Sequence, residues 1–136
     1  MSIDPAAFNH ITGPIIAAAI DVHRTLGPGL LESTYMPCLE YELAARKLRF
    51  VKHQAIPIVY KEMKLGTNYY ADLIVEDRIV VEIKSIAVVL PVHAAQTLTY
   101  LRLTNCPVGL LINFNVPRLV DGVQRVLNPG WAAAAV

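Results

Sequence analysis

The chain has 136 residues, of which 54% are hydrophobic, so it is long and apolar enough for one domain with a full core. Its 12 basic and 11 acidic residues give a net charge of +1, which excludes strong attraction to a long polyanion. Cys38 and Cys106 stand far apart and form no C-x-x-C pair, which disfavours a disulfide framework and a zinc site. We therefore expect a single domain over residues 1–136 in a reducing, cytoplasmic setting.

The N-terminal part of the chain predicts two helices. Thr12 is the expected cap of the first, Pro14 lies in its first turn, and apolar residues recur every three or four positions at Ile11, Ile15, Ala19, Val22 and Leu26. Residues 27–29, Gly-Pro-Gly, should end this helix. A second apolar row predicts a helix to about residue 48, through Leu31, Tyr35, Leu39 and Leu43. The apolar run 13–20 is too short to span a bilayer, so we expect no membrane contact.

The middle of the chain predicts three strands. Residues 52–60 alternate with a period of two, and Pro57 favours a sheet edge for this first strand. Residues 61–67 are polar and contain Gly66, as a turn does. Residues 68–75 alternate again, residues 76–78 form a charged turn, and residues 79–85 return as a third strand.

The C-terminal part predicts a helix and two further strands. Pro91 opens a helical stretch to about residue 103, and residues 108–114 have the composition of a buried strand. A turn at Asp121 and Gly122 precedes a last short strand. The order of elements predicts an α/β fold with a core over about residues 12–127, followed by an apolar tail, residues 128–136, that docks on the body or on a partner.

Two carboxylates meet in the predicted sheet. Side chains alternate along a strand, so Glu82 and Lys84 share one face of the third strand. If the turn 76–78 places Val75 opposite Ile79, Asp72 lies directly across from Glu82. Because opposed like charges repel, a cation is expected beside them. A divalent ion such as Mg²⁺ meets that need, and so does a salt bridge from Lys84; both interpretations stay open.

A third carboxylate, Glu32, lies three residues before Tyr35 and is expected on or beside the buried stripe of the second helix. A buried acid there requires a partner. The alternative is a first-turn glutamate that is favoured by the helix dipole or that caps the amide of Gly29.

The next predicted helix carries two further candidates. Gln96 and Tyr100 stand one turn apart and share a face, where the amide can orient a phosphate or a water. The four histidines show no metal-ligand spacing and are assigned to packing or solvent, with His93, near Gln96, as the first exception.

Together these residues resemble the GxxExxY family of the PD-(D/E)xK nuclease superfamily, whose name motif is met by Gly29, Glu32 and Tyr35. The resemblance covers about residues 12–127. It implies a restriction-endonuclease-like core of helix, three strands, helix and strand, with a mixed sheet flanked by helices and an extra N-terminal helix. One departure is Ala71, which stands where the superfamily's name has proline.

The resemblance assigns a role to each candidate residue. Glu32 corresponds to the acidic residue of the first core helix, Asp72 to the metal-binding aspartate, and Glu82, Ile83 and Lys84 to the ExK element. Gln96 and Tyr100 correspond to a Q-x-x-x-Y motif. The expected metal ligands are Asp72, Glu82, the carbonyl of Ile83 and Glu32, and the expected catalytic residues are Asp72, Glu82, Lys84, Gln96 and Glu32.

The implied function is Mg²⁺- or Mn²⁺-dependent hydrolysis of phosphodiester bonds in DNA or RNA, with Lys84 and Gln96 acting on the attacking water. The near-neutral charge favours a local or single-stranded substrate, or a homodimer that concentrates basic residues. The alternative is a non-catalytic nuclease fold that serves in oligomerisation or partner binding. A small phosphoester substrate is the third hypothesis.

Overall fold

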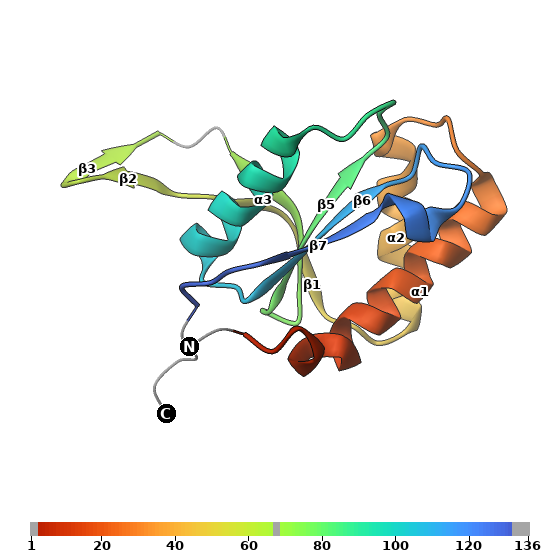
Figure 1. Ribbon diagram of the computed structural model, residues 1–136, viewed down its shortest axis with the longest axis horizontal. Helices are drawn as coiled ribbons and strands as arrows, with labels where there is room; N and C mark the ends of the chain where they lie inside the picture. Colours follow the sequence, from red (N-terminus) through yellow and green to blue (C-terminus); the bar gives the residue numbers. More distant parts are fainter. Residues whose placement is uncertain (1–2, 67–68, 132–136) are drawn as a thin grey trace.

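The computed structural model describes residues 3–66 and 69–131 (Figure 1). A short 3-10 turn, η1, precedes two helices, and α3 follows five of the strands. In chain order the elements are η1 Pro5–Phe8, α1 Asn9–Leu26, α2 Glu32–Ala45, β1 Phe50–Ala55, β2 Ile58–Tyr60, β3 Met63–Leu65, β4 Tyr70–Val75, β5 Ile79–Lys84, α3 Pro91–Thr104, β6 Val108–Asn113, η2 Leu119–Gly122 and β7 Val123–Leu127. None of the helices in the described ranges has the length and apolar character needed to cross a membrane.

The main sheet is mixed. Its strand order is β1-β4-β5-β6-β7, in which β5 and β6 run parallel and the other neighbouring pairs run antiparallel. The parallel pair is connected through α3, as a crossover connection requires. The strands β2 and β3 form a separate antiparallel hairpin that extends away from the body (Figure 1). This arrangement confirms the predicted order of helix, three strands, helix and strand with an added N-terminal helix.

Helices cover both faces of the sheet (Figure 1). On one face α1 and α2 pack on the larger core, which includes Ile79, Val81 and Ile83 of β5. On the other face α3 packs on a smaller cluster that includes Val80. The alternation predicted for β5 is therefore confirmed, and Glu82 and Lys84 belong to the strand positions that face α3.

The helix boundaries correct three expectations. Thr12 is not a cap, because α1 begins at Asn9 and Thr12 is buried inside it, where its hydroxyl accepts a hydrogen bond from Arg125 of β7. Leu31 precedes α2 and is 72% exposed, so it does not extend the apolar row. The second helix ends at Ala45, before the predicted residue 48.

The strand boundaries correct two more. The predicted strand 52–60 is divided at Pro57, which has no N–H to donate to a ladder, so β1 ends at Ala55 and β2 begins at Ile58 in the hairpin. The predicted turn 61–67 contains β3, whose register pairs Tyr60 with Met63.

The start of the C-terminal tail docks on the body. The indole of Trp131 packs edge-on against Phe8, with ring centroids 5.7 Å apart. The predicted tail continues over residues 132–136, which lie outside the described residues.

Candidate active site

The site is built where the β4–β5 ladder stops. The register pairs Leu73 with Val81 and Val75 with Ile79, which confirms the pairing predicted from the turn. The next pair in that register is Asp72 and Glu82, and there side chains replace the ladder. The amide of Asp72 donates to Oε2 of Glu82 at 3.0 Å, and the amide of Ile83 donates to Oδ2 of Asp72 at 2.8 Å. Each carboxylate is thus fixed by the opposite strand.

The strand β4 bends at Asp72. Ala71 packs with the cluster under α3, whereas Leu73, two residues later, packs with the core under α1 and α2, although such residues share a face in a regular strand. The neighbouring strand is also interrupted, because its register skips His53, the residue opposite Asp72, and His53 has a positive φ of 50°. Because of this bend, Asp72 lines one pocket on the α2 side of the sheet and another that also contains residues of α3.

Burial beside a second carboxyl group makes Glu82 a weak acid. Its side chain is buried, with 4% exposure. Burial is the main cause that raises the pKa of Glu82 to about 8, and the negative charge of Asp72 is the second. The amide of Asp72 and, less strongly, the charge of Lys84 oppose this rise. Without a cation the pair therefore holds a proton at neutral pH.

Lys84 does not neutralise the pair by direct contact. Within residues 3–66 and 69–131, no carboxylate lies within ion-pair distance of its ammonium group. The alternative prediction, a salt bridge from Lys84 to Asp72 or Glu82, is therefore wrong. Its charge still acts on Glu82 from the same face of the sheet. Lys84 is half-buried and remains available to a ligand.

Glu32 reaches the site from the first turn of α2. Its Oε2 accepts a hydrogen bond from the amide of Ser85, just after β5, at 3.0 Å. The side chain is exposed, so the expectation of a buried acid is wrong. The reason is that Glu32 is the first residue of α2, whose buried face begins only at Tyr35.

The other two motif residues shape the connection before α2. Gly29 has a φ of +93°, which favours glycine. The hydroxyl of Tyr35 donates to the carbonyl of Gly27 at 2.6 Å and accepts from the amide of Leu30 at 3.1 Å. The ring stacks on Phe114 with centroids 4.4 Å apart. The motif thus anchors the start of α2 beside the end of β5.

The helix α3 completes the site from the opposite side. A Cβ on Gly109 of β6 would lie 2.8 Å from Thr97 of this helix, so glycine permits their close approach. Gln96 is half-buried and Tyr100 is 5% exposed. The pKa of Tyr100 is raised first by burial and then by the charges of Glu82 and Asp72.

The structure brings all the predicted site residues to one pocket of about 410 Å³. Its walls come from α2, β4, β5 and α3, and three tyrosines contribute to them. The lining residues are Glu32, Tyr69, Tyr70, Asp72, Glu82, Ile83, Lys84, Gln96 and Tyr100. Tyr69 and Tyr70 were not among the predicted site residues, because nothing in the sequence shows that the start of β4 lies at the pocket.

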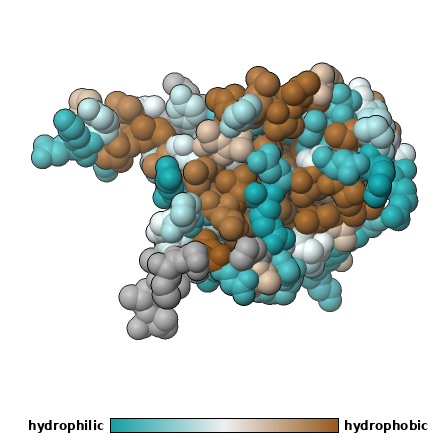
Figure 2. Space-filling model, in the orientation of Figure 1, coloured by the Kyte–Doolittle hydropathy of each residue, from teal (hydrophilic) through white to brown (hydrophobic). Residues whose placement is uncertain are grey.

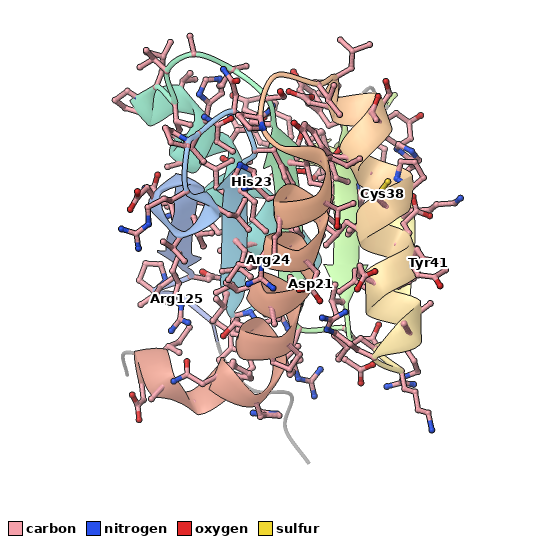
Figure 3. The ribbon with its side chains drawn as sticks, turned by 90° about the vertical axis from the view of Figure 1, so that its right-hand side faces the viewer. Asp21, His23, Arg24, Cys38, Tyr41 and Arg125 are labelled. Carbon is pink, nitrogen blue, oxygen red and sulfur yellow. The ribbon has the colours of Figure 1, made fainter. Side chains whose placement is uncertain are left out.

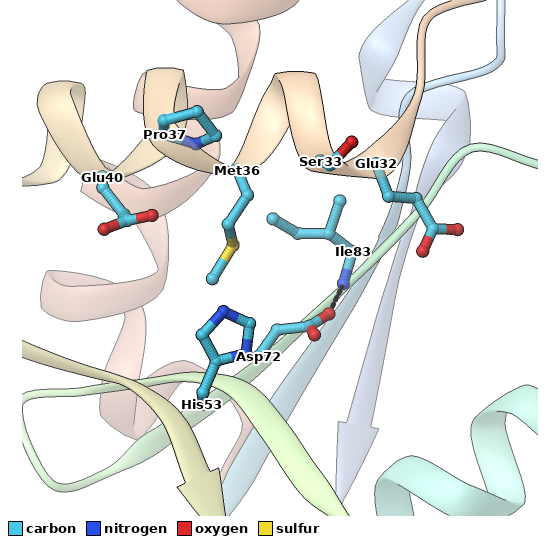
Figure 4. A pocket seen from close by; sticks show the side chains of 8 residues that line it. All are labelled: Glu32, Ser33, Met36, Pro37, Glu40, His53, Asp72 and Ile83. Carbon is cyan, nitrogen blue, oxygen red and sulfur yellow. Dashed lines mark hydrogen bonds between the residues drawn. The ribbon is translucent and has the colours of Figure 1, made fainter.

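A second pocket, of about 360 Å³, reaches Asp72 from the α2 side (Figure 4). Figure 4 shows His53 beside Asp72, with Met36 and Glu40 above them. The histidine that lies near the site is therefore His53. His93, the exception favoured from the sequence, accepts a hydrogen bond from the amide of Leu90 and caps α3.

The donor set fits a hard divalent cation. The carboxylates of Asp72 and Glu82 are oxygen ligands of the kind that Mg²⁺ and Mn²⁺ prefer, and Ile83, whose main-chain carbonyl is a further oxygen, lines the same pocket. A cation would offset the negative charge of Asp72, which after burial is the second cause of the raised pKa of Glu82. In the described ranges, no three acidic, histidine or cysteine side chains are grouped as a metal site. An ion held by Asp72 and Glu82 would therefore take further oxygens from water or a substrate.

The comparisons with known proteins agree with this geometry. No curated protein and no solved structure matches the chain significantly. A family model described as the PD-(D/E)XK nuclease superfamily matches residues 9–126, which span α1 to β7. The mixed sheet between α2 and α3 is consistent with the restriction-endonuclease-like fold that the sequence predicted. The chain belongs to the PD-(D/E)XK nuclease superfamily.

Proposed function

We propose that this protein is a divalent-metal-dependent nuclease that hydrolyses phosphodiester bonds in DNA or RNA. The observation that carries the proposal is the pair Asp72 and Glu82, fixed at an interrupted ladder in the same pocket as Lys84. The negative charge of Asp72 helps to raise the pKa of Glu82, and a cation bound between the two would offset that charge. Superfamily membership supports the same reaction.

Each residue then has a role in the reaction. Asp72, Glu82 and the carbonyl of Ile83 would hold Mg²⁺ or Mn²⁺ with Glu32 beside them, and the ion would supply Lewis acidity that lowers the pKa of a water. Lys84 positions that water and offsets the charge that develops on the phosphate. Gln96 orients the water or the scissile strand through its amide.

Several finer predictions belong to this proposal. Gly29, Glu32 and Tyr35 support placement in the GxxExxY family. The free thiols of Cys38 and Cys106 suit the predicted reducing, cytoplasmic setting. A single domain and a homodimer stay predictions.

The proposal is tested by cleavage and by metal binding. Full-length protein is incubated with labelled single-stranded, duplex and branched DNA and RNA, with Mn²⁺ or with chelator. We expect Mn²⁺-dependent cutting that is lost in Lys84→Ala and kept in Arg102→Ala, which removes an exposed cation from α3. Cutting that persists in Lys84→Ala would remove this lysine from the mechanism.

Calorimetry separates the nuclease from a non-catalytic member of the superfamily. Mn²⁺ should bind the wild type and fail to bind Asp72→Asn and Glu82→Gln. Asp77→Asn, in the exposed turn between β4 and β5, is the matched control and should bind normally. Absence of both Mn²⁺ binding and cutting would instead favour the oligomerisation or partner-binding module.

A further inference from the structure

The hairpin β2–β3 presents an unusual surface beside the proposed active site. A two-stranded hairpin is marginally stable alone, and this one is anchored at its base, where Ile58 packs on the cluster that contains Tyr100. Figure 2 shows its projecting surface as a mixture of hydrophobic and hydrophilic residues. The large apolar side chains are about half exposed: Val59 at 54%, Tyr60 at 57%, Met63 at 57% and Leu65 at 47%.

Two further tyrosines stand between the hairpin and the carboxylates. Tyr69 is 49% exposed and Tyr70 is 50% exposed, and both line the pocket that contains Glu82 and Lys84. The backbone of Tyr70 is fixed because it pairs with Ala55 of β1. Half-exposed aromatic rings at a polar pocket offer flat faces on which a base can stack.

The charge of the hairpin is net positive, because Lys61 and Lys64 outnumber the exposed Glu62 between them, and this favours an anionic occupant. Lys61 and Lys64 are exposed on the hairpin, and in residues 3–66 and 69–131 neither has a carboxylate within ion-pair distance. The ammonium of Lys61 lies 5.4 Å from the ring centroid of Tyr60, so charge and aromatic surface occur together. Phosphates between exposed bases match this pattern.

We propose that Tyr69, Tyr70 and the hairpin form a path that binds single-stranded nucleic acid and leads it into the pocket. This inference rests on the proposed function, because it gives that site a substrate class. The tyrosines stack on bases, and Lys61 and Lys64 contact the phosphates. Duplex bases are already stacked on one another and cannot offer their faces. A net charge of +1 also suits a short single-stranded contact better than a long duplex footprint.

The test measures binding without cleavage. Full-length protein is titrated into fluorescein-labelled oligo-dT and oligo-U of about 15 nucleotides, and into a duplex of equal length, in chelator, with anisotropy as the readout. We expect tighter binding to one or both single strands than to the duplex. Tyr69→Ala and Tyr70→Ala should each weaken that binding roughly fivefold or more, whereas the phenylalanine variants keep it.

Two controls make the result specific. Tyr41→Ala removes a tyrosine that is 73% exposed on the outer surface of α2 and should bind as the wild type does (Figure 3). The double variant Lys61→Ala, Lys64→Ala should weaken binding and reduce the slope of its logarithmic salt dependence by about 1.4. Each variant is checked for folding by thermal melting.

Three outcomes would overturn the inference. These are equal or tighter binding to the duplex, unchanged binding in both tyrosine-to-alanine variants, and a change in association state by ultracentrifugation for the hairpin variants while strand binding is unaffected. Failure here and failure of the proposed function are distinguishable. Binding without metal-dependent cutting contradicts only the nuclease, and cutting with normal binding in the tyrosine variants contradicts only this path.

Discussion

The two ends of the β4–β5 pair follow different rules. Near the turn, Leu73, Val75, Ile79 and Val81 form a regular ladder and are fully buried. At the open end, the carboxyl groups of Asp72 and Glu82 accept hydrogen bonds from main-chain amides of the opposite strand, and Glu82 is buried with a raised pKa. The closed end of this strand pair therefore serves packing, whereas the open end presents the two carboxylates of the proposed site.

The largest expected effect comes from a substitution in the buried ladder at the closed end. Leu73→Ala removes a fully buried side chain opposite Val81 and should lower the free energy of unfolding by about 2–5 kcal/mol, because it leaves a cavity under α1 and α2. Urea unfolding measures the loss. Val51→Ala, on β1 and 48% exposed, is the control and should change stability by about 0.5 kcal/mol at most. Equal losses of unfolding free energy in both variants would contradict the structural role of the closed end.

The second effect isolates the open end through pH. The pKa of Glu82 is about 8 in the folded state against 4.5 ordinarily, so the folded state holds an extra proton between these values. Its stabilising contribution is complete below pH 4.5 and is lost as the pH rises toward and through 8, by at most about 1.4 kcal/mol per pH unit.

Glu82→Gln has no such proton to lose. In chelator, the stability of the wild type relative to this variant should therefore fall between pH 5 and pH 8, as urea midpoints at intermediate values would show. Mn²⁺ affinity of the wild type should rise over the same window, because the metal replaces the proton. A stability difference that is constant with pH would count against the buried, protonated acid.

A smaller effect concerns the helix that closes the pocket. Gly109→Ala places a methyl group 2.8 Å from Thr97 and should cost about 1–3 kcal/mol through overpacking. Gly13→Ala, inside α1, meets no neighbour within 4 Å and should instead stabilise the protein by about 0.5–1 kcal/mol. Thermal melting measures both changes, and the melting temperature should fall for Gly109→Ala and rise for Gly13→Ala. A destabilised Gly13→Ala or a neutral Gly109→Ala would refute the packing argument.

The smallest effect tests the backbone at the bend. His53 has a φ of 50° opposite Asp72, a region that favours glycine, so His53→Gly should stabilise by about 0.5–1 kcal/mol. Gln54→Gly, at the next position of the same strand, should instead lower the free energy of unfolding by about 0.5–1 kcal/mol. Denaturant unfolding of the pair provides the measurement. Equal destabilisation at both positions would show that His53 is unstrained.

The central pairing of the site could be predicted because it depends on local rules. The turn over residues 76–78 fixes which residues of β4 and β5 face each other, and alternation then places Glu82 and Lys84 together. Pairing rules do not reveal that the ladder stops before Asp72, because that depends on the bend in β4 and the break at His53.

Other features depended on tertiary geometry that the sequence does not encode locally. The hydrogen bond from the amide of Ser85 to Glu32 depends on how the connection after α1 meets the end of β5. The hairpin arises because Pro57 divides a segment whose alternation is continuous in the sequence. The placement of Tyr69 and Tyr70 at the pocket depends on where β4 starts relative to α3.

The hydroxyl of Tyr35, bonded to both Gly27 and Leu30, has a consequence for how the chain can vary in length. These two hydrogen bonds tie the connection between α1 and α2 to the first turns of α2, so its length must match the reach of the Tyr35 side chain. We expect that an inserted or deleted residue in this connection would break these hydrogen bonds and displace Glu32. In residues 3–66 and 69–131, no side-chain hydrogen bond closes the turn of the β2–β3 hairpin in this way, so we expect changes of length to be tolerated there.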